Sequence, residues 1–222
     1  MVDEVSKMYE GYWQRKEGLE NFDDYERNQI LKKLFQSGEV VLDLASGEGA
    51  VSEFLKKLGC EVTAFDISKE ALKKAAARGV KTVSGNVENK LPFKDESFDA
   101  IFWGDNVEHL FLPAKTLTEI HRILKKSGRL VISTPNMSYW RYRLFYLFKG
   151  MVPQTEWYNQ SPWEWEHIRF FNQKIMTNFL SQNKFNLDKF FGVSSRRLDQ
   201  PLLNLLPHLF GMIMVVEAFK ND

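Results

Sequence analysis

Apolar runs of strand length alternate along this chain with segments in which apolar residues recur at helical spacing. The predicted strands are 40–45, 61–65, 81–84, 98–104, 129–134, 185–192 and 211–220, and the predicted helices are 22–36, 50–58, 69–78, 113–125 and 172–183. Strands that alternate with helices build a parallel sheet with helices on both faces. The last two strands are close enough in sequence to pair as an antiparallel hairpin, so the pattern predicts an α/β fold.

Helix signals support several of these boundaries. Ser68 is a good N-cap for the helix at 69–78, and Pro113 suits the first turn of the helix at 113–125. The chain of 222 residues fits one domain. We therefore expect a single domain over 1–222 with an N-terminal helical segment at 1–37, in which residues 1–18 either form a flap or pack as a helix at an edge.

The stretch VVLDLASGEG at 40–49 carries most of the functional information. It reads as a strand followed by a glycine-rich turn, and the next segment reads as a helix. Glycines let the backbone bend sharply and lie against a ligand. The second strand ends at Asp66, where a carboxylate can accept both hydroxyls of a ribose.

The spacing of the glycines in this turn distinguishes between two classes of ligand. A dinucleotide site has the pattern G-x-G-x-x-G, whereas Gly47 and Gly49 are followed by Ser52. Asp43 and Glu48 add negative charge that would repel a pyrophosphate. Such a turn suits a ligand with a cationic end, such as S-adenosylmethionine (SAM), and disfavours a nicotinamide oxidoreductase.

VLDLASGEG resembles the first motif of class I SAM-dependent methyltransferases, D-x-G-x-G-x-G, with Ala45 at the first glycine. A strongly positive φ at Ala45 would be strained. GNVENKLPFKDESFDAIFWGDNVEHL at 85–110 and ILKKSGRLVISTPN at 123–136 resemble later family motifs in the same order, and the likeness extends to methyltransferase type 11 and MetW-like proteins. It implies a seven-stranded, mostly parallel, doubly wound (Rossmann-like) sheet whose last strand is antiparallel.

The resemblance also implies a set of SAM-binding residues at the C-terminal ends of the strands. The expected cofactor-binding residues are Asp43, Ala45, Ser46 and Gly47 around the methionine end, Asp66 and Ile67 at the ribose, Asn86 and Val87 near adenine, and Asp105 where cofactor and acceptor meet. The expected partner is a small-molecule acceptor.

Two of the four histidines are candidates for acceptor chemistry. His109 follows the fourth strand, and His167 ends an aromatic stretch, so we expect both at the acceptor side. They would act as bases toward a hydroxyl, or position an amine or carboxylate. Glu108 and His109 would point about 100° apart on a helix, so no metal site is expected. Arg169 is either an anion anchor or a surface charge.

The segment 135–171 is unusually aromatic and reads as an insertion. We expect it to cap the acceptor pocket, although a dimer face or contact with lipid is left open. Leucines at 198–210 would cover the pocket or rest against a second subunit. The resemblance to MetW-like proteins implies one alternative function. The protein would then be a SAM-binding regulatory subunit that partners an acyltransferase in methionine biosynthesis and has little catalytic activity of its own.

Composition and net charge argue against several classes of protein. A net charge of +1 gives no reason to expect nucleic-acid binding, and a single cysteine excludes a disulfide framework. The chain has neither an apolar run long enough to span a membrane nor a secretory leader. The sequence thus predicts a cytoplasmic protein with no stable membrane insertion, as a monomer or a homodimer.

Overall fold

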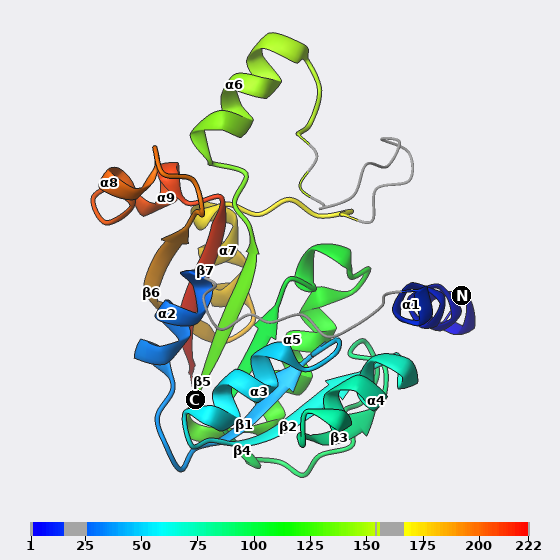
Figure 1. Cartoon of the computed structure of the whole chain (residues 1–222). Helices are drawn as coiled ribbons and strands as arrows, with labels where there is room; N and C mark the ends of the chain where they lie inside the picture. Colours follow the sequence, from blue (N-terminus) through cyan, green and yellow to red (C-terminus); the bar gives the residue numbers. More distant parts are fainter. Residues whose placement is uncertain (1, 16–25, 154, 156–166, 222) are drawn as a thin grey trace.

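The computed structural model describes residues 2–15, 26–153, 155 and 167–221. A seven-stranded sheet forms its centre, with the strand order β3-β2-β1-β4-β5-β7-β6 (Figure 1). The strands are β1 Val40–Leu44, β2 Glu61–Asp66, β3 Lys81–Ser84, β4 Phe98–Gly104, β5 Leu124–Pro135, β6 Phe185–Val193 and β7 Ile213–Lys220.

Strand directions follow the prediction. β1 pairs in parallel with β2 and β4, β2 with β3, and β4 with β5. β7 is antiparallel to both of its neighbours, β5 and β6. The expected mostly parallel sheet with an antiparallel last strand is confirmed.

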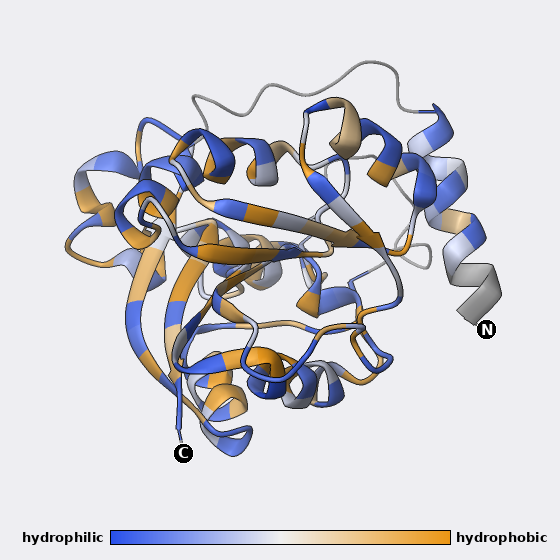
Figure 2. Cartoon of the chain, turned by 90° about the horizontal axis from the view of Figure 1, so that it is seen from below, coloured by the Kyte–Doolittle hydropathy of each residue, from blue (hydrophilic) through white to orange (hydrophobic). Residues whose placement is uncertain are grey.

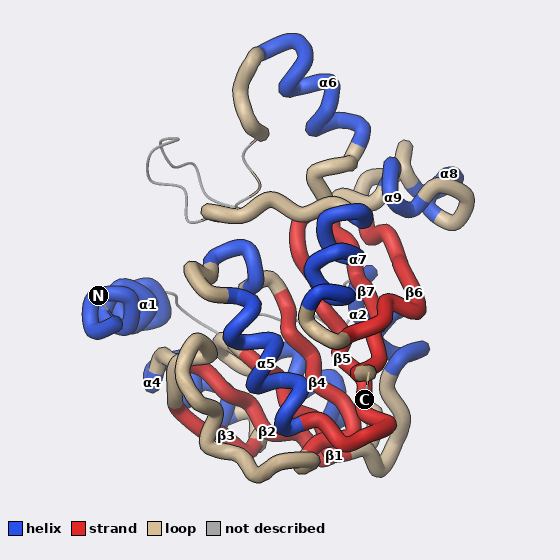
Figure 3. Tube along the Cα trace, turned by 180° about the vertical axis from the view of Figure 1, so that it is seen from behind, coloured by secondary structure: helices blue, strands red, loops and turns tan. Residues whose placement is uncertain are grey.

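Helices cover both faces of the sheet (Figures 1 and 3). One face carries α2 Glu26–Leu34, α3 Ala50–Lys57 and α4 Lys69–Ala77, and the other carries α5 Pro113–Ile123 and α7 Gln173–Gln182. Successive strand residues point to opposite faces, so Val41 packs into the first core and Leu42 into the second. Figure 2 shows the apolar residues concentrated along the strands.

The structure starts β5 earlier than the sequence pattern predicted. Helix α5 ends at Ile123, and β5 already begins at Leu124. Its pairing with β4 shifts register between the pairs Phe98–Leu124 and Ala100–Arg129. The polar KKSG stretch therefore forms an irregularity within the strand edge, where the sequence suggested a turn between elements.

The N-terminal segment contains α1 Val2–Arg15, which lies beside α4 at one edge of the sheet (Figure 1). The Glu10 carboxylate accepts hydrogen bonds from Ser68 Oγ and from the backbone N–H groups of Lys69 and Glu70. Ser68 itself caps α4 through Ala71 N, as predicted. α1 is thus an edge helix tied to the N-terminus of α4.

Part of the aromatic insertion forms α6 Trp140–Lys149, a helix that the sequence analysis did not predict. It extends away from the sheet with no buried residue, and Phe148 is 76% exposed (Figure 1). α6 therefore supplies no packed cap. The expected cap residues Trp157, Trp163 and Trp165 lie outside the described residues.

The leucine-rich stretch before β7 contains two further short helices, α8 Gln200–Leu203 and α9 Pro207–Phe210. The buried Asp199 carboxylate accepts hydrogen bonds from Tyr139 Oη at 2.7 Å and Trp140 Nε1 at 2.9 Å, which ties this stretch to the start of α6. Within the described ranges, no helix is both long and apolar enough to cross a bilayer.

Candidate functional site

The glycine-rich turn after β1 has the left-handed backbone that its sequence requires. Gly47 and Gly49 have φ values of 54° and 74°. A Cβ on Gly49 would lie 2.7 Å from Ala75 Cβ, so α4 packs against the bare backbone there. Ala45 has φ 60°, so it adopts the left-handed conformation that is strained for alanine. A Cβ on Gly47 would meet the Trp13 ring at 2.8 Å, which places α1 over the turn.

Asp43 lies buried at the end of β1. Its Oδ2 accepts a hydrogen bond from Ser52 Oγ at 2.5 Å. Ser52 is the residue that breaks the dinucleotide pattern, and its hydroxyl orients the acid instead. Burial raises the pKa of Asp43 to about 6, and the Ser52 bond and the Arg27 charge oppose this shift. A cation beside Asp43 would favour its ionised form.

Asp66 connects the second strand to the glycine turn. Its Oδ2 accepts from Gly47 N at 2.9 Å, and its Oδ1 accepts from Ser68 N at 2.8 Å. Burial raises the pKa of this carboxyl, while the two backbone donors lower it. Each carboxylate oxygen has a second lone pair, so both can still accept from ribose hydroxyls.

The residues expected near adenine follow β2 and β3. The Asn86 side-chain oxygen accepts from Glu88 N at 2.8 Å, so the turn role left open in the sequence is present. Val87 is buried, and its carbonyl accepts from Thr116 Oγ1 at 3.2 Å. Ile67 is half-buried directly after Asp66. Contact of Asn86 and Val87 with adenine, and of Ile67 with the ribose, stays a prediction.

Asp105 is exposed directly after β4, and its contact with the cofactor stays a prediction. It forms an ion pair with Arg27, and its Oδ1 accepts from Ser133 Oγ at 3.1 Å. Arg27 comes from α2, is 7% exposed and also donates to Ser133 Oγ at 3.2 Å. Sequence reasoning missed Arg27, although its spacing from Leu31 and Leu34 places it on the buried face of α2.

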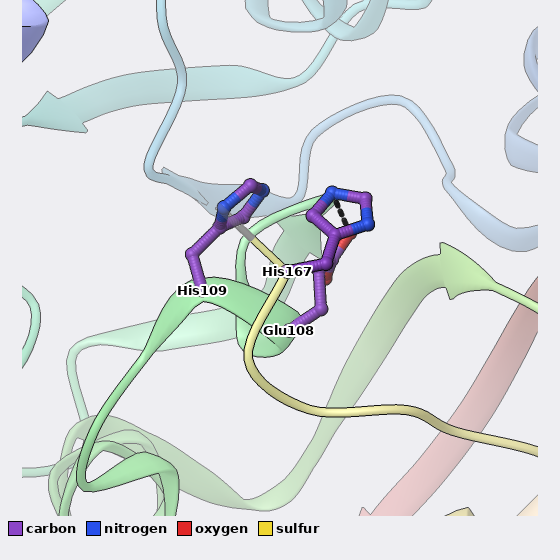
Figure 4. Close-up of side chains that lie close together, drawn as sticks. All are labelled: Glu108, His109 and His167. Atoms are coloured by element: carbon purple, nitrogen blue, oxygen red, sulfur yellow. Dashed lines mark ion pairs between the residues drawn. The ribbon is translucent and has the colours of Figure 1, made fainter. Parts of the chain in front are cut away.

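Glu108, His109 and His167 come together after β4 (Figure 4). Their ligand atoms all lie within 4.8 Å of one another, and the two imidazole centroids are 4.5 Å apart. Glu108 and His109 belong to the single turn η1 Val107–His109, a 3₁₀ helix. Burial and, to a smaller extent, the charge of Asp105 together raise the pKa of Glu108 to about 8.

The loop that carries His167 is held against this turn. The backbone N–H groups of Ile168 and Arg169 both donate to the Glu108 carbonyl at 3.0 Å. The Arg169 side chain donates to the carbonyl oxygens of Leu110 and Phe111 at 2.9 and 2.6 Å. Arg169 is therefore a structural clamp, a role that neither interpretation of the sequence contained.

The positions of Glu108, His109 and His167 bear on the expectation that this region holds no metal site. Glu108 and His109 were expected to point too far apart to share an ion, and no other ligand was foreseen. The structure brings in His167 from a distant segment, and all three ligand atoms converge. The two discounted histidines lie elsewhere, since His121 Nε2 contacts the Asn221 carbonyl at 2.8 Å and His208 belongs to α9.

Comparisons with known proteins agree with this geometry. Residues 42–132 match the family model described as a methyltransferase domain. The chain is 39% identical over 109 residues to a demethylmenaquinone methyltransferase of Paenarthrobacter aurescens, covering 47% of this chain and 43% of the relative. It is 31% identical over 146 residues to a ubiquinone biosynthesis O-methyltransferase of Xylella fastidiosa, covering 61% and 58%. The chain thus spans about half the length of these curated relatives.

Solved structures share the fold over nearly the whole chain. A SAM-dependent methyltransferase from Mesorhizobium loti superposes with a TM-score of 0.63 at 19% identity, covering 89% of this chain and 99% of that one. One from Aquifex aeolicus gives 0.62 at 19% identity, covering 98% and 97%. Residues 42–132, which include the turn between Asp43 and Asp66, thus match a methyltransferase domain, and the seven-stranded sheet has the fold of these SAM-dependent methyltransferases.

Proposed function

We propose that this protein transfers a methyl group from SAM to a small-molecule acceptor. The observation that carries the proposal is the convergence of two buried carboxylates, Asp43 and Asp66, on one glycine turn. An anionic turn disfavours a pyrophosphate and suits the cationic methionine end of SAM. The regulatory alternative linked to an acyltransferase receives no support from the comparisons.

Each strand end contributes to one part of the cofactor in this proposal. Asp43, Ser46 and Gly47 surround the methionine end, and the Asp66 carboxylate accepts from the ribose. Asn86 and Val87 lie by adenine. The charge of Arg27 acts on both Asp43 and Glu108, so the cofactor turn and the group of Glu108, His109 and His167 are electrostatic neighbours. The acceptor therefore enters beside the two histidines.

The protein's main task is to hold the two reactants in line. The sulfonium is already a good electrophile, and orientation alone contributes roughly 7–11 kcal/mol to catalysis in favourable cases. A hydroxyl acceptor must also lose its proton near the moment of transfer, which is the role predicted for His109 or His167. Since a named relative is an O-methyltransferase of ubiquinone biosynthesis, we propose a hydroxylated acceptor.

A methyl-transfer assay with ³H-methyl SAM and a panel of phenols, catechols and amines tests this proposal. Labelled product with at least one hydroxylated compound, absent from boiled protein, is the expected result. Labelling of amines alone would overturn the hydroxyl acceptor. The absence of a nucleic-acid partner and the formation of a homodimer stay predictions, which band-shift assays and light scattering can test.

A further inference from the structure

We infer that Glu108, His109 and His167 bind a divalent first-row transition-metal ion on the acceptor side of the site. The three residues offer one carboxylate oxygen and two imidazole nitrogens, and these atoms lie within 4.8 Å of one another. Figure 4 shows the His167 ring facing the Glu108 carboxylate, with His109 alongside. No sequence motif alone brings these residues together, since His167 reaches η1 from the far side of the aromatic insertion.

The spacing is close to that of a bound ion. Metal bonds to nitrogen and oxygen are about 2.0–2.2 Å long, so three ligands of one ion lie about 3–4 Å from one another. The donor atoms of Glu108, His109 and His167 lie within 4.8 Å of one another, so the most distant pair needs to approach by about 1 Å. A direct hydrogen bond between a carboxylate and an imidazole would instead be about 2.7–3.2 Å long. The 4.0 Å between Glu108 Oε1 and His167 Nε2 is too long for that bond and leaves room for an ion between them.

Neighbouring hydroxyls orient two of the three donors. Thr155 Oγ1 lies 2.5 Å from His167 Nδ1, which leaves Nε2 to face Glu108. Thr134 Oγ1 donates to Glu108 Oε2 at 2.9 Å. Ligating side chains in metal sites are held in this way by hydrogen bonds to their other polar atom.

The remaining oxygen of Glu108 is the second sign of a ligand. Glu108 is only 2% exposed, and no group among the described residues donates a hydrogen bond to its Oε1. A buried carboxylate oxygen without a donor is costly. A cation between Glu108 and the two imidazoles would satisfy it.

The donor set selects the class of metal. Two imidazoles and one carboxylate suit zinc, iron, cobalt or manganese, whereas magnesium and calcium prefer oxygen ligands throughout. Asp105 does not extend the set, because Arg27 and Ser133 already hold its carboxylate. Three protein ligands leave coordination positions open, which is the pattern of catalytic sites.

The catalytic role of this ion rests on the proposed function, methyl transfer from SAM to an acceptor. A hydroxyl of the acceptor would occupy an open position and lose its proton to solvent more easily, as metal-bound water does. Its oxygen then forms the new bond to the methyl carbon while the carbon–sulfur bond breaks, and SAM leaves as neutral S-adenosylhomocysteine. With the ion bound, His109 and His167 act as its ligands, and the ion takes over the task of the base that the proposed function gives to one of them. A catechol, whose two adjacent oxygens can chelate, is the acceptor class that fits best.

Metal binding can be measured without the reaction. The full chain is stripped with EDTA, dialysed, and titrated with Zn²⁺ against a chromophoric chelator and with Co²⁺ by visible absorption. We expect one high-affinity ion per chain, a Co²⁺ spectrum typical of nitrogen and oxygen ligation, and no displacement of Zn²⁺ by millimolar Mg²⁺. Displacement by Mg²⁺ would contradict the assigned metal class.

Variants locate the site. His109→Ala and His167→Ala should each weaken Zn²⁺ binding at least tenfold, with circular dichroism and SAM affinity unchanged. The matched control is His121→Ala, whose ring contacts the Asn221 carbonyl away from the cluster and which should bind Zn²⁺ like the wild type. Wild-type Zn²⁺ affinity in both cluster variants would overturn the inference. Because SAM binding is measured separately by calorimetry, loss of SAM binding would count against the proposed function and not against the metal site.

Discussion

Asp66 accepts a hydrogen bond from the backbone N–H of Gly47 at 2.9 Å, which joins the end of β2 to the glycine turn after β1. The same carboxylate accepts from Ser68 N at the start of α4. One buried acid thus fixes the turn, the second strand and a helix N-terminus in a single arrangement. We predict that Asp66, held in this arrangement beside the buried Asp43, accepts the ribose hydroxyls of SAM.

Replacing Asp66 with alanine should weaken SAM by about 1.5–3 kcal/mol, the range for hydrogen bonds to a charged group. Isothermal titration calorimetry measures the change. Asp99→Ala is the matched control, because Asp99 Oδ2 also accepts a hydrogen bond from a backbone N–H, that of Val40, at 2.9 Å. This bond lies at the amino ends of β1 and β4, away from the glycine turn. Unchanged SAM affinity in the Asp66 variant would refute the ribose assignment.

Asp43 should make stability depend on pH. Its pKa is raised from 3.8 to about 6 in the folded chain, so the folded state holds this proton more tightly than the unfolded one. The unfolding free energy of the wild type should therefore fall relative to Asp43→Asn as pH rises from 4 to 6, by about 2 kcal/mol of a total of about 3 kcal/mol. Urea unfolding of both proteins across this range measures the difference, and parallel curves would exclude the assigned shift.

The ionisation of Asp43 should also make the affinity for SAM depend on pH. A cationic ligand favours the ionised form of Asp43, so the affinity of the wild type should rise between pH 5 and 7. The asparagine variant cannot ionise and should show a weaker affinity with a flatter profile. An equally steep profile in Asp43→Asn would show that another group controls the pH dependence.

Arg27 should link stability to cofactor binding. Arg27→Ala removes the ion pair with Asp105 and is expected to cost about 1–3 kcal/mol, less than for a fully buried pair because the Asp105 side chain is 43% exposed. It also removes a charge that lowers the pKa of Asp43, so SAM affinity at neutral pH should fall.

Arg122→Ala is the control for this variant. Arg122 forms ion pairs with Glu119 and Asp95, and it has no part in the cofactor turn. Its loss should lower stability and leave SAM affinity unchanged. An equal loss of SAM affinity in both variants would show that the effect of Arg27 is merely structural.

The exposed face of α6 should be free of stabilising contacts within the monomer. Phe148→Ser is expected to change the unfolding free energy by less than about 0.5 kcal/mol, because this side chain is 76% exposed. Leu180→Ala, in the buried core, should cost about 2–5 kcal/mol. Thermal or urea unfolding compares the two. A large loss in Phe148→Ser would mean that α6 packs against another surface.

Much of the fold could be predicted because its signals are local. The strands β1, β2 and β4, the cap at Ser68 and the left-handed glycines depend on neighbouring residues. The carboxylates Asp43 and Asp66 stand at strand ends, so the alternation of strands and helices alone places them at one edge.

The remaining features depend on contacts between distant segments. Arg27 reaches Asp105 from another helix, and the Arg169 clamp brings His167 to Glu108. Neither contact has a spacing rule that a sequence reader could apply. The helix α6 was also missed, because its aromatic residues suggested a pocket lining and its isolated position gives no amphipathic pattern of burial.

Calorimetric titration of the purified chain with SAM, S-adenosylhomocysteine and NADH tests the central claim most directly. We predict one binding site per chain for SAM and for S-adenosylhomocysteine, and no heat of binding for NADH. Binding of NADH, or the absence of SAM binding at millimolar concentration, would contradict the assignment of the Asp43–Asp66 turn as a SAM site.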